Sequence, residues 1–276
     1  MIAGAKKEWL KMEGVNNILV QNESMEINTI MNQDCIKAMT GIPDNTVDLI
    51  VTDPPFNIGK KYNSYKDKMK KEEYLAWCEN WLDGCIRILK PHGSIYLFNY
   101  PENNAYLLPF LDERMVFRRW LTWHYPTNTG MSPKNFTRTQ HSILFYTKTK
   151  NSIFNKNEVA EPYKNPTDRR IKKLIASGKK GRTPYDVFQF NIVKNVSKEK
   201  TEHVCQLPEK LVEIFVKASS NKGQLVFDPF MGSGTVAAVA KKLGRNYIGC
   251  EIDKKYCEII NKRLNEIPVP LSNFSK

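Results

Sequence analysis

The sequence has no uninterrupted run of about 18 apolar residues, which is the minimum that a membrane-spanning helix needs. The first 14 residues include lysines but lack the apolar stretch of about 7 to 15 residues that characterises a secretory signal. The sequence therefore predicts neither a membrane span nor a secretory signal. We expect the protein in the cytoplasm.

Cysteine pairs of the metal-binding or redox type are also missing. The six cysteines stand at positions 35, 78, 85, 205, 250 and 257, no two form a Cys-x-x-Cys pair, and no histidine cluster accompanies them. Such isolated cysteines are typical of free thiols in a reducing compartment. We therefore expect buried free thiols and no metal site.

Acidic residues are few relative to basic ones. The chain has 29 Asp and Glu against 42 Lys and Arg, a formal net charge of +13. Residues 148–200 alone contain 14 Lys and Arg but only 5 Asp and Glu. A basic surface can simply assist solubility, but an excess concentrated in a fifth of the chain favours a surface that tracks phosphates.

Strand and helix patterns alternate along most of the chain and predict one doubly wound α/β domain with a mostly parallel sheet. We divide the sequence into an N-terminal extension (1–25), two halves of this domain (26–147 and 201–276) and an inserted region (148–200) with little sustained periodicity. Strands are predicted at 47–52, 94–99, 117–124, 141–147, 224–228 and 246–251, and helices at 71–89, 103–112, 208–219, 234–243 and 254–266. Lys90, Pro91 and Gly93 are expected to end the helix over 71–89.

A glycine-rich turn follows the strand at 224–228 and reads Asp228-Pro229-Phe230-Met231-Gly232-Ser233-Gly234-Thr235. Glycines there let a ligand approach the backbone closely. Glu251 ends the next strand, where its carboxylate can accept hydrogen bonds from ribose hydroxyls. No lysine follows Gly234, which argues against a triphosphate loop.

A dinucleotide stays open as the ligand of this turn, because Gly232, Gly234 and Ala237 fit Gly-x-Gly-x-x-Ala. The Asp228 carboxylate would repel a pyrophosphate, whereas it suits the positive amino group of a methionine moiety. Local chemistry therefore favours S-adenosylmethionine.

A second turn, Asp53-Pro54-Pro55-Phe56, ends the strand at 47–52. Two prolines remove backbone donors and leave carbonyl acceptors. Asp53 adds another acceptor and Phe56 a flat apolar face, a combination that suits the exocyclic amino group of a base. The alternative is a rigid strand-end turn with a buried phenylalanine.

Together the two turns resemble those of the β-group amino-methyltransferases of DNA, enzymes of the restriction-modification type that modify N6 of adenine or N4 of cytosine. The order, with the catalytic motif first and the cofactor motif last, matches that group, and the resemblance spans about residues 26–266. It implies a Rossmann-like S-adenosylmethionine-dependent fold, an inserted target-recognition region and double-stranded DNA as substrate. Phe56 stands where the family more often has Tyr.

The resemblance also implies roles for single residues. Asp53, Pro54, Pro55 and Phe56 would be catalytic. The cofactor would be held by Asp34, Cys35, Asp53, His203, Gln206, Asp228, Pro229, Phe230, Gly232, Ser233, Gly234, Thr235, Glu251 and Ile252. In the segment around His203 and Gln206, Val204 and Leu207 replace the family's usual Pro and Lys, which weakens that assignment.

The reaction that the resemblance implies is methylation of adenine N6 after the base leaves the duplex. Cytosine N4 is the close alternative, and an NAD-dependent oxidoreductase or a catalytically silent DNA-binding module are more distant ones. The candidate DNA-binding residues are Arg169, Arg170, Lys172, Lys173, Lys179, Lys180 and Arg182. Trp77 and Trp81 recur at helical spacing, which favours the core or a subunit contact over a base-stacking surface. A homodimer, for which these two residues are candidate contacts, and a cognate restriction endonuclease are further expected partners.

Overall fold

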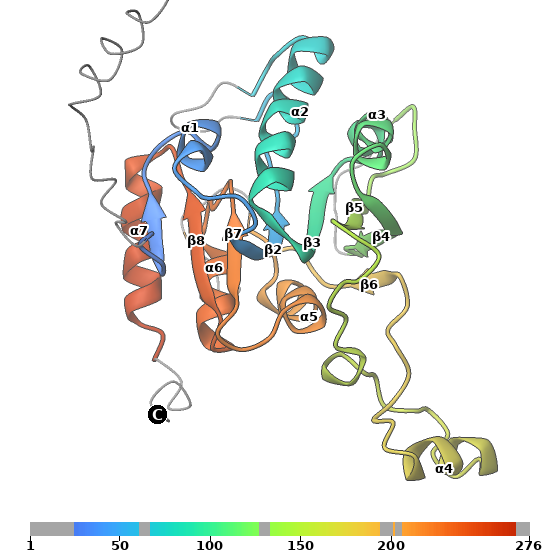
Figure 1. Ribbon diagram of the computed structural model, residues 1–276. Helices are drawn as coiled ribbons and strands as arrows, with labels where there is room; N and C mark the ends of the chain where they lie inside the picture. The colour runs from blue at the N-terminus through green and yellow to red at the C-terminus, as the bar shows by residue number, and fades with distance from the viewer. Residues whose placement is uncertain (1–24, 61–66, 127–132, 194–200, 202–205, 269–276) are drawn as a thin grey trace, which may run out of the picture.

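The computed structural model describes residues 25–60, 67–126, 133–193, 201 and 206–268. Its centre is one eight-stranded sheet in the order β1-β8-β7-β2-β3-β5-β4-β6 (Figure 1). Only β5 runs antiparallel to its neighbours. The strands are β1 (Thr29–Met31), β2 (Val47–Thr52), β3 (Leu89–Asn99), β4 (Val116–His124), β5 (Gln140–Thr147), β6 (Val187–Gln189), β7 (Leu225–Asp228) and β8 (Asn246–Cys250).

Helices cover both faces of this sheet, so the predicted doubly wound architecture is confirmed. One face packs against α1 (Cys35–Thr40), α2 (Lys71–Ile88) and α3 (Pro101–Asp112). The other packs against α5 (Glu209–Ser219), α6 (Thr235–Lys242) and α7 (Lys254–Asn265). None of the described helices is long and apolar enough to cross a membrane.

The central strand β2 shows why this sequence folds as a two-faced sheet. All six of its residues are buried, because a central parallel strand is covered by helices on both sides. Leu49 and Val51 enter the core under α5 and α6, whereas Val47 and Ile50 enter the core under α1 and α2. The strand pairs with β7 on one side and β3 on the other, so the two halves of the chain share one sheet.

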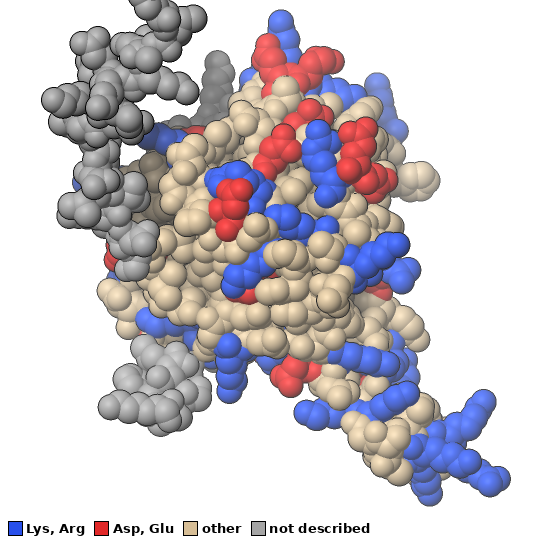
Figure 2. Space-filling view, in the orientation of Figure 1, with Lys and Arg blue, Asp and Glu red and all other residues tan. Residues whose placement is uncertain are grey.

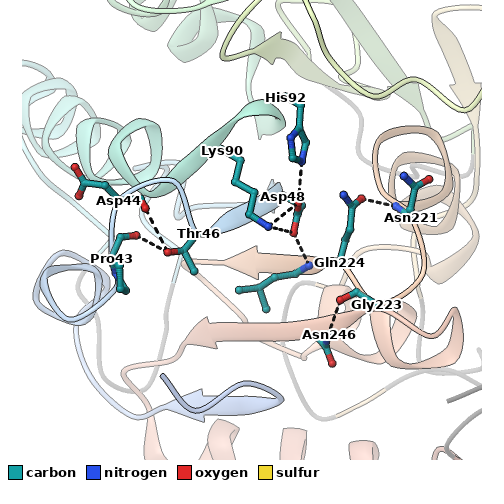
Figure 3. Close-up of polar contacts among 11 residues, drawn as sticks. Pro43, Asp44, Thr46, Asp48, Lys90, His92, Asn221, Gly223, Gln224 and Asn246 are labelled. Atoms are coloured by element: carbon teal, nitrogen blue, oxygen red, sulfur yellow. Dashed lines mark hydrogen bonds and ion pairs between the residues drawn. The ribbon is translucent and has the colours of Figure 1, made fainter. Parts of the chain in front are cut away.

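A buried polar cluster joins three strands at the amino edge of the sheet (Figure 3). The Asp48 carboxylate accepts hydrogen bonds from Lys90 Nζ at 3.0 and 2.9 Å and from the Leu225 backbone N–H at 2.9 Å. His92 Nε2 lies 2.8 Å from the same carboxylate. Helix α2 ends at Ile88, as the Pro and Gly after it predicted, but β3 begins at Leu89 and not at the predicted residue 94, and Lys90 and His92 in this added part of the strand contact Asp48.

The inserted region is more regular than its sequence indicated. It contains a short 3-10 helix, η1 (Lys156–Glu158), the helix α4 (Arg169–Ala176) and β6. Because β5 ends at the amino edge, the chain leaves the sheet there at residue 148, and it re-enters the sheet at β6, which pairs with Thr122, Trp123 and His124 at the carboxyl end of β4. In Figure 1, α4 accordingly lies below the sheet, away from the carboxyl ends of the parallel strands.

Candidate active site

The two turns singled out in the sequence meet at the carboxyl edge of the sheet. Asp53 follows β2 and Asp228 ends β7, and these two strands pair directly through Leu49 with Val226 and Ile50 with Phe227. Both turns line one cleft. Its remaining lining comes from the segment between β1 and α1, from α2, from the residue before Pro208, from α6 and from the end of β8 to the start of α7: Gln33, Asp34, Cys35, Trp77, Leu207, Val236, Cys250, Glu251, Ile252, Asp253 and Tyr256.

The glycine turn needs glycine at two positions, because its backbone has positive φ and packs closely against its neighbours. Gly234 has φ +71°, and a side chain there would lie 2.5 Å from Ile260 Cγ2. Gly232 also has positive φ, and its N–H donates to Glu251 Oε2 at 2.8 Å. Asp253 N–H donates to the other Glu251 oxygen at 2.9 Å, so the Glu251 carboxylate is fixed in the cleft wall.

Buried carboxylates give the cleft its electrostatic character. Burial raises the pKa of Asp228 to about 8, with added repulsion from Asp53 and Glu251, although the Phe230 N–H opposes the shift. Burial likewise raises the pKa of Asp53 to about 7, against the attraction of Lys60. Burial also raises the pKa of Glu251. Three carboxyl groups in one cleft disfavour an anion and favour a cation.

This set of carboxyl groups fits S-adenosylmethionine better than a dinucleotide. The methionine moiety carries an ammonium group that can pair with Asp228, and the adenosine ribose can donate to Glu251. A pyrophosphate would instead meet the carboxylates of Asp228 and Glu251. No group of three or more candidate metal ligands is found among the described residues.

In the Asp-Pro-Pro-Phe turn, two of the backbone carbonyls already accept hydrogen bonds. The Tyr74 hydroxyl donates to the Pro55 carbonyl at 2.8 Å, and Asn103 Nδ2 donates to the Phe56 carbonyl at 2.9 Å. Within the described chain, no hydrogen bond reaches the Pro54 carbonyl, and the buried Asp53 Oδ1 has none either. Two acceptors therefore stand available at the cleft.

Phe56 belongs to a group of rings at the same edge. It is 7% exposed, and its ring centroid lies 5.1 Å from Tyr100 and 5.2 Å from His141. His141 in turn stacks on Trp123 at 5.2 Å. Phe56 also lines the cleft, so a base can reach its ring only from the cleft side.

Most of the residues predicted to bind the cofactor do line the cleft, with three exceptions. Gly234 shapes the turn from behind, and Gln206 Oε1 accepts from the Thr201 backbone N–H and hydroxyl at 2.9 and 3.0 Å. His203 lies outside the described residues. Asp34 lines the cleft and also caps α1 through the Ile36 and Lys37 N–H groups.

Trp77 is a cleft residue that the sequence reading missed. Its helical spacing with Trp81 indicated a core or subunit contact, but Trp77 lines the cleft and lies 5.5 Å from the Phe230 ring. Trp81 is completely buried and also contacts Phe230, so the interpretation of Trp81 as a dimer contact is wrong. The two rings are four residues apart and so lie on one side of α2, and only the one nearer the amino end of the helix lines the cleft.

The seven basic residues predicted to bind DNA do not lie in the cleft. They lie on α4 and the segment after it, on the side of the sheet opposite the cleft. We call residues 148–186 the basic arm, and Figure 2 shows a cluster of blue side chains at its end. Arg182 differs from the others, because it pairs with Glu161 and covers the Tyr185 ring at 3.8 Å.

A doubly wound sheet with a cation-favouring glycine turn beside an Asp-Pro-Pro-Phe turn defines the class of methyltransferases that modify exocyclic amino groups. Comparison with protein families gives the same class: residues 47–262 match the DNA methylase family whose members act at N6 or N4. The chain belongs to this family of S-adenosylmethionine-dependent DNA methyltransferases.

Curated relatives match over most of their own lengths. The chain is 37% identical over 235 residues to the Type II methyltransferase M.HpaI of Haemophilus parainfluenzae, covering 84% of this chain and 72% of that one. It is 36% identical to the Type II methyltransferase M1.MboII of Moraxella bovis, covering 89% and 99%. It is 32% identical to the DNA adenine methyltransferase YhdJ of Escherichia coli (strain K12), covering 87% and 83%.

Solved structures share the fold. The cytosine-N4-specific PvuII DNA methyltransferase superposes with a TM-score of 0.68 at 18% identity, covering 90% of each chain. The complex of M1.HpyAVI with SAM superposes with a TM-score of 0.61 at 24% identity, covering 86% of this chain and 98% of that one. Both confirm the Rossmann-like methyltransferase fold expected from the sequence.

Proposed function

We propose that this chain transfers a methyl group from S-adenosylmethionine to N6 of adenine in double-stranded DNA, at a specific sequence and in the cytoplasm. The observation that carries the proposal is the pair of available acceptors, the Asp53 carboxylate and the Pro54 carbonyl, in the same cleft as the Asp228 and Glu251 carboxylates. An Asp before Pro-Pro is more common with adenine than with cytosine in the family that the sequence resembles. The similarity to YhdJ, a DNA adenine methyltransferase, supports the same target.

The cofactor would be held by the glycine turn and by the carboxylates around it. Asp228 would pair with the methionine ammonium and Glu251 would accept from the ribose hydroxyls, and both residues line the cleft. Bound S-adenosylmethionine supplies an electrophilic methyl group on a sulfonium sulfur. Further contacts are proposed for Asp34, Cys35, Pro229, Phe230, Gly232, Ser233, Thr235 and Ile252, all of which line the cleft, with Gly234 shaping the turn.

The chain's own groups act on the amino nitrogen of the base. Its lone pair is delocalised into the ring, so the nitrogen is a weak nucleophile. Asp53 and the Pro54 carbonyl can each accept one of its two N–H bonds, which draws the nitrogen toward tetrahedral geometry and localises the lone pair. Once the new N–C bond has formed, the nitrogen carries one proton too many, and Asp53, with its pKa raised to about 7, can take it.

The base must leave the duplex to enter this cleft, because its amino group is otherwise engaged in base pairing. Unstacking costs a few kcal/mol, and stacking on Phe56 together with the two hydrogen bonds offsets that cost. Phe56 lacks the hydroxyl of the family's more common Tyr but keeps the ring face.

The inserted region 148–200 is proposed as the target-recognition region, and its basic arm as a contact for DNA phosphates. Arg169, Arg170, Lys172, Lys173, Lys179 and Lys180 are exposed, as phosphate contacts require. M.HpaI and M1.MboII are named Type II methyltransferases, which supports a cognate restriction endonuclease acting at the same site.

Asp53→Asn tests the mechanism. The amide keeps the size of the side chain but cannot take a proton, so we expect kcat to fall by at least 10²-fold, the lower range of acid–base contributions, with S-adenosylmethionine affinity nearly unchanged. Methyl transfer is measured with a tritiated methyl group, and mass spectrometry of nucleosides from the product distinguishes N6-methyladenine from N4-methylcytosine. Near-normal turnover by Asp53→Asn would exclude this role of Asp53, and N4-methylcytosine would exclude adenine as the target.

A further inference from the structure

Asn99, the last residue of β3, is completely buried. It lies behind the Asp-Pro-Pro-Phe turn, which we call the catalytic turn because the proposed function assigns catalysis to it. Its Nδ2 donates a hydrogen bond to the Tyr74 hydroxyl at 3.1 Å. Its Oδ1 accepts from Asn103 Nδ2 at 2.9 Å and from the Tyr100 backbone N–H at 2.8 Å. Asn99 therefore connects α2, β3 and α3 immediately behind the site.

The two side chains that Asn99 contacts are the ones that occupy carbonyls of the catalytic turn. Tyr74 donates to the Pro55 carbonyl at 2.8 Å, and Asn103 donates to the Phe56 carbonyl at 2.9 Å. Each hydrogen bond fixes the direction of one carbonyl of the turn next to the Pro54 carbonyl. Both Tyr74 and Asn103 are in turn hydrogen-bonded to the Asn99 side chain.

The orientation of the Asn99 amide is determined by its surroundings. The Tyr100 backbone N–H can only donate, so the atom that it meets must be the amide oxygen. The amide nitrogen then faces Tyr74 and donates to the hydroxyl oxygen. A hydroxyl has a single hydrogen, and with its oxygen already accepting from Asn99, that hydrogen is directed to the Pro55 carbonyl.

We propose that Asn99 is a positioning residue of the methyl-transfer reaction, which orients Tyr74 and Asn103 so that only Pro54 presents its carbonyl to the extruded base. Asn99 touches neither the cleft nor the base and acts through the turn. The proposal rests on the proposed function, since it needs an amino group as the acceptor of the methyl group.

Asn99→Ala removes the side chain that orients both Tyr74 and Asn103. Tyr74→Phe removes only the contact with the Pro55 carbonyl, and Asn103→Ala removes only the contact with the Phe56 carbonyl. We expect Asn99→Ala to lower kcat by about 10- to 100-fold, the loss associated with misplacing reacting groups by about 1 Å. The dissociation constant of S-adenosylmethionine should change less than twofold, because no Asn99 contact reaches the cofactor turn. The effects of Asn99→Ala and Tyr74→Phe should be non-additive, since Asn99 acts through Tyr74.

Asn104→Ala is the matched control. Asn104 is equally buried and comes from the same helix as Asn103, but it donates to Ser142 on β5 at 2.7 Å and not to the turn. We expect it to lower thermal stability without lowering kcat. The inference fails if folded Asn99→Ala keeps kcat within twofold of the wild type, or if Asn104→Ala lowers kcat equally. Wild-type protein that methylates no DNA would instead overturn the proposed function.

The basic arm carries a second, independent inference. The cleft is at the carboxyl edge of the sheet, whereas the chain leaves β5 at the amino edge and α4 lies below that edge (Figure 1). The nine residues of β4 alone separate these edges by about 30 Å at roughly 3.3 Å per residue. A duplex that delivers a base to the cleft would have to bend back along the protein to meet α4 of the same copy.

The arm is nevertheless shaped for contact with DNA. No residue of α4 is buried, and between Asp168 and Arg182 seven basic residues face a single acidic one, Asp168, which caps the helix. Asn155 anchors the base of the arm to the end of α5 through the Lys217 and Ser220 carbonyls at 3.1 and 2.9 Å. The arm thus holds a charged helix away from the body.

We infer that α4 contacts the phosphates of DNA whose target base enters the cleft of a second copy of this chain. A complementation experiment tests this inference. One partner is Asp53→Ala with an intact arm. The other has an intact Asp53 and carries Arg169→Gln, Arg170→Gln, Lys172→Gln and Lys173→Gln together.

We expect each variant alone to lose at least 10-fold in methyl transfer and the co-expressed mixture to recover part of it. A mixture of Asp53→Ala with an arm variant that also carries Asp53→Ala is the control. An arm variant with an unchanged KM for DNA would show that the arm makes no such contact. An inactive mixture of tagged, co-purified copies would show that each arm serves its own cleft. Either result overturns the inference without touching the proposed methyl transfer.

Discussion

The protonation of single carboxyl groups in the cleft should depend on whether a positively charged ligand is bound. Asp53 and Asp228 lie close enough for the charge of one to raise the pKa of the other. Without a cation, burial favours their protonated forms. A bound ammonium or sulfonium reverses that preference, so cofactor binding should prepare Asp53 as an acceptor for the base.

At the residue scale, we expect the affinity for S-adenosylmethionine to rise as the pH increases from 6 to 8. Asp228, with its pKa raised to about 8, must lose its proton to pair with the ammonium group. Asp228→Asn should bind more weakly and lose this pH dependence. Isothermal titration at several pH values measures both effects.

5′-Methylthioadenosine, which lacks the amino acid part, is the matched control ligand for this titration. Its affinity should be the same for the wild type and Asp228→Asn, because no ammonium group is present to meet Asp228. Equal weakening of both ligands by Asp228→Asn would show that Asp228 shapes the turn and does not bind the ammonium group.

At the scale of elements, one edge of the sheet carries the candidate site and the other contributes to stability. The carboxyl edge carries the cleft, and the amino edge carries the Asp48 cluster that ties β2 to β3 and β7. Parallel strands end on the same side, which explains why catalytic groups gather at one edge while the other is free to be stabilised.

Asp48→Ala tests whether the amino edge contributes to stability without contributing to methyl transfer. The substitution leaves the buried Leu225 N–H unsatisfied and removes the partner of Lys90, so we expect a loss of about 2–4 kcal/mol in the free energy of unfolding. Urea denaturation measures the loss, and methyl transfer per folded molecule should not change. Asp44→Ala, which breaks only the exposed pair with Arg87, should lose less than about 1 kcal/mol. A fall in kcat of folded Asp48→Ala would contradict the separation of the edges.

At the scale of the whole molecule, the same carboxyl groups govern stability in the absence of ligand. Unfolded carboxyl groups of Asp titrate near 3.9, whereas Asp53 and Asp228 hold protons up to pH of about 7 and about 8 in the fold. The folded state therefore binds more protons than the unfolded state between these limits, and stability falls as the pH rises.

Buried His141 acts in the opposite sense but at lower pH. Burial lowers its pKa to about 4, so its contribution to stability is gained as the pH rises to about 6.5, the ordinary value of histidine. Between pH 6.5 and 8 only the carboxyl groups of this set remain. We expect the melting temperature of the ligand-free protein to fall across that interval, and Asp228→Asn to fall less. Calorimetry in buffers of equal ionic strength checks this, and a flat wild-type profile would contradict it.

The local sequence determined most of the elements outside residues 148–200 and the identity of the two turns. Period-2 and helical spacing, together with proline and glycine positions, gave the alternating pattern, and Asp53-Pro54-Pro55-Phe56 and Asp228–Thr235 were readable because their chemistry is written in consecutive residues. Pairing of β2 with β7 then confirmed the cleft that these two turns required.

Tertiary structure alone decided what depends on contacts between distant residues. It extended β3 back to Leu89 beside Asp48, placed Trp77 and not Trp81 in the lining of the cleft, and placed α4 on the side of the sheet away from the cleft (Figure 1). It also connected Asn99 to the catalytic turn through Tyr74 and Asn103. None of these follows from local patterns, because burial, pKa and the partner of a polar side chain depend on neighbours that only the folded chain brings together.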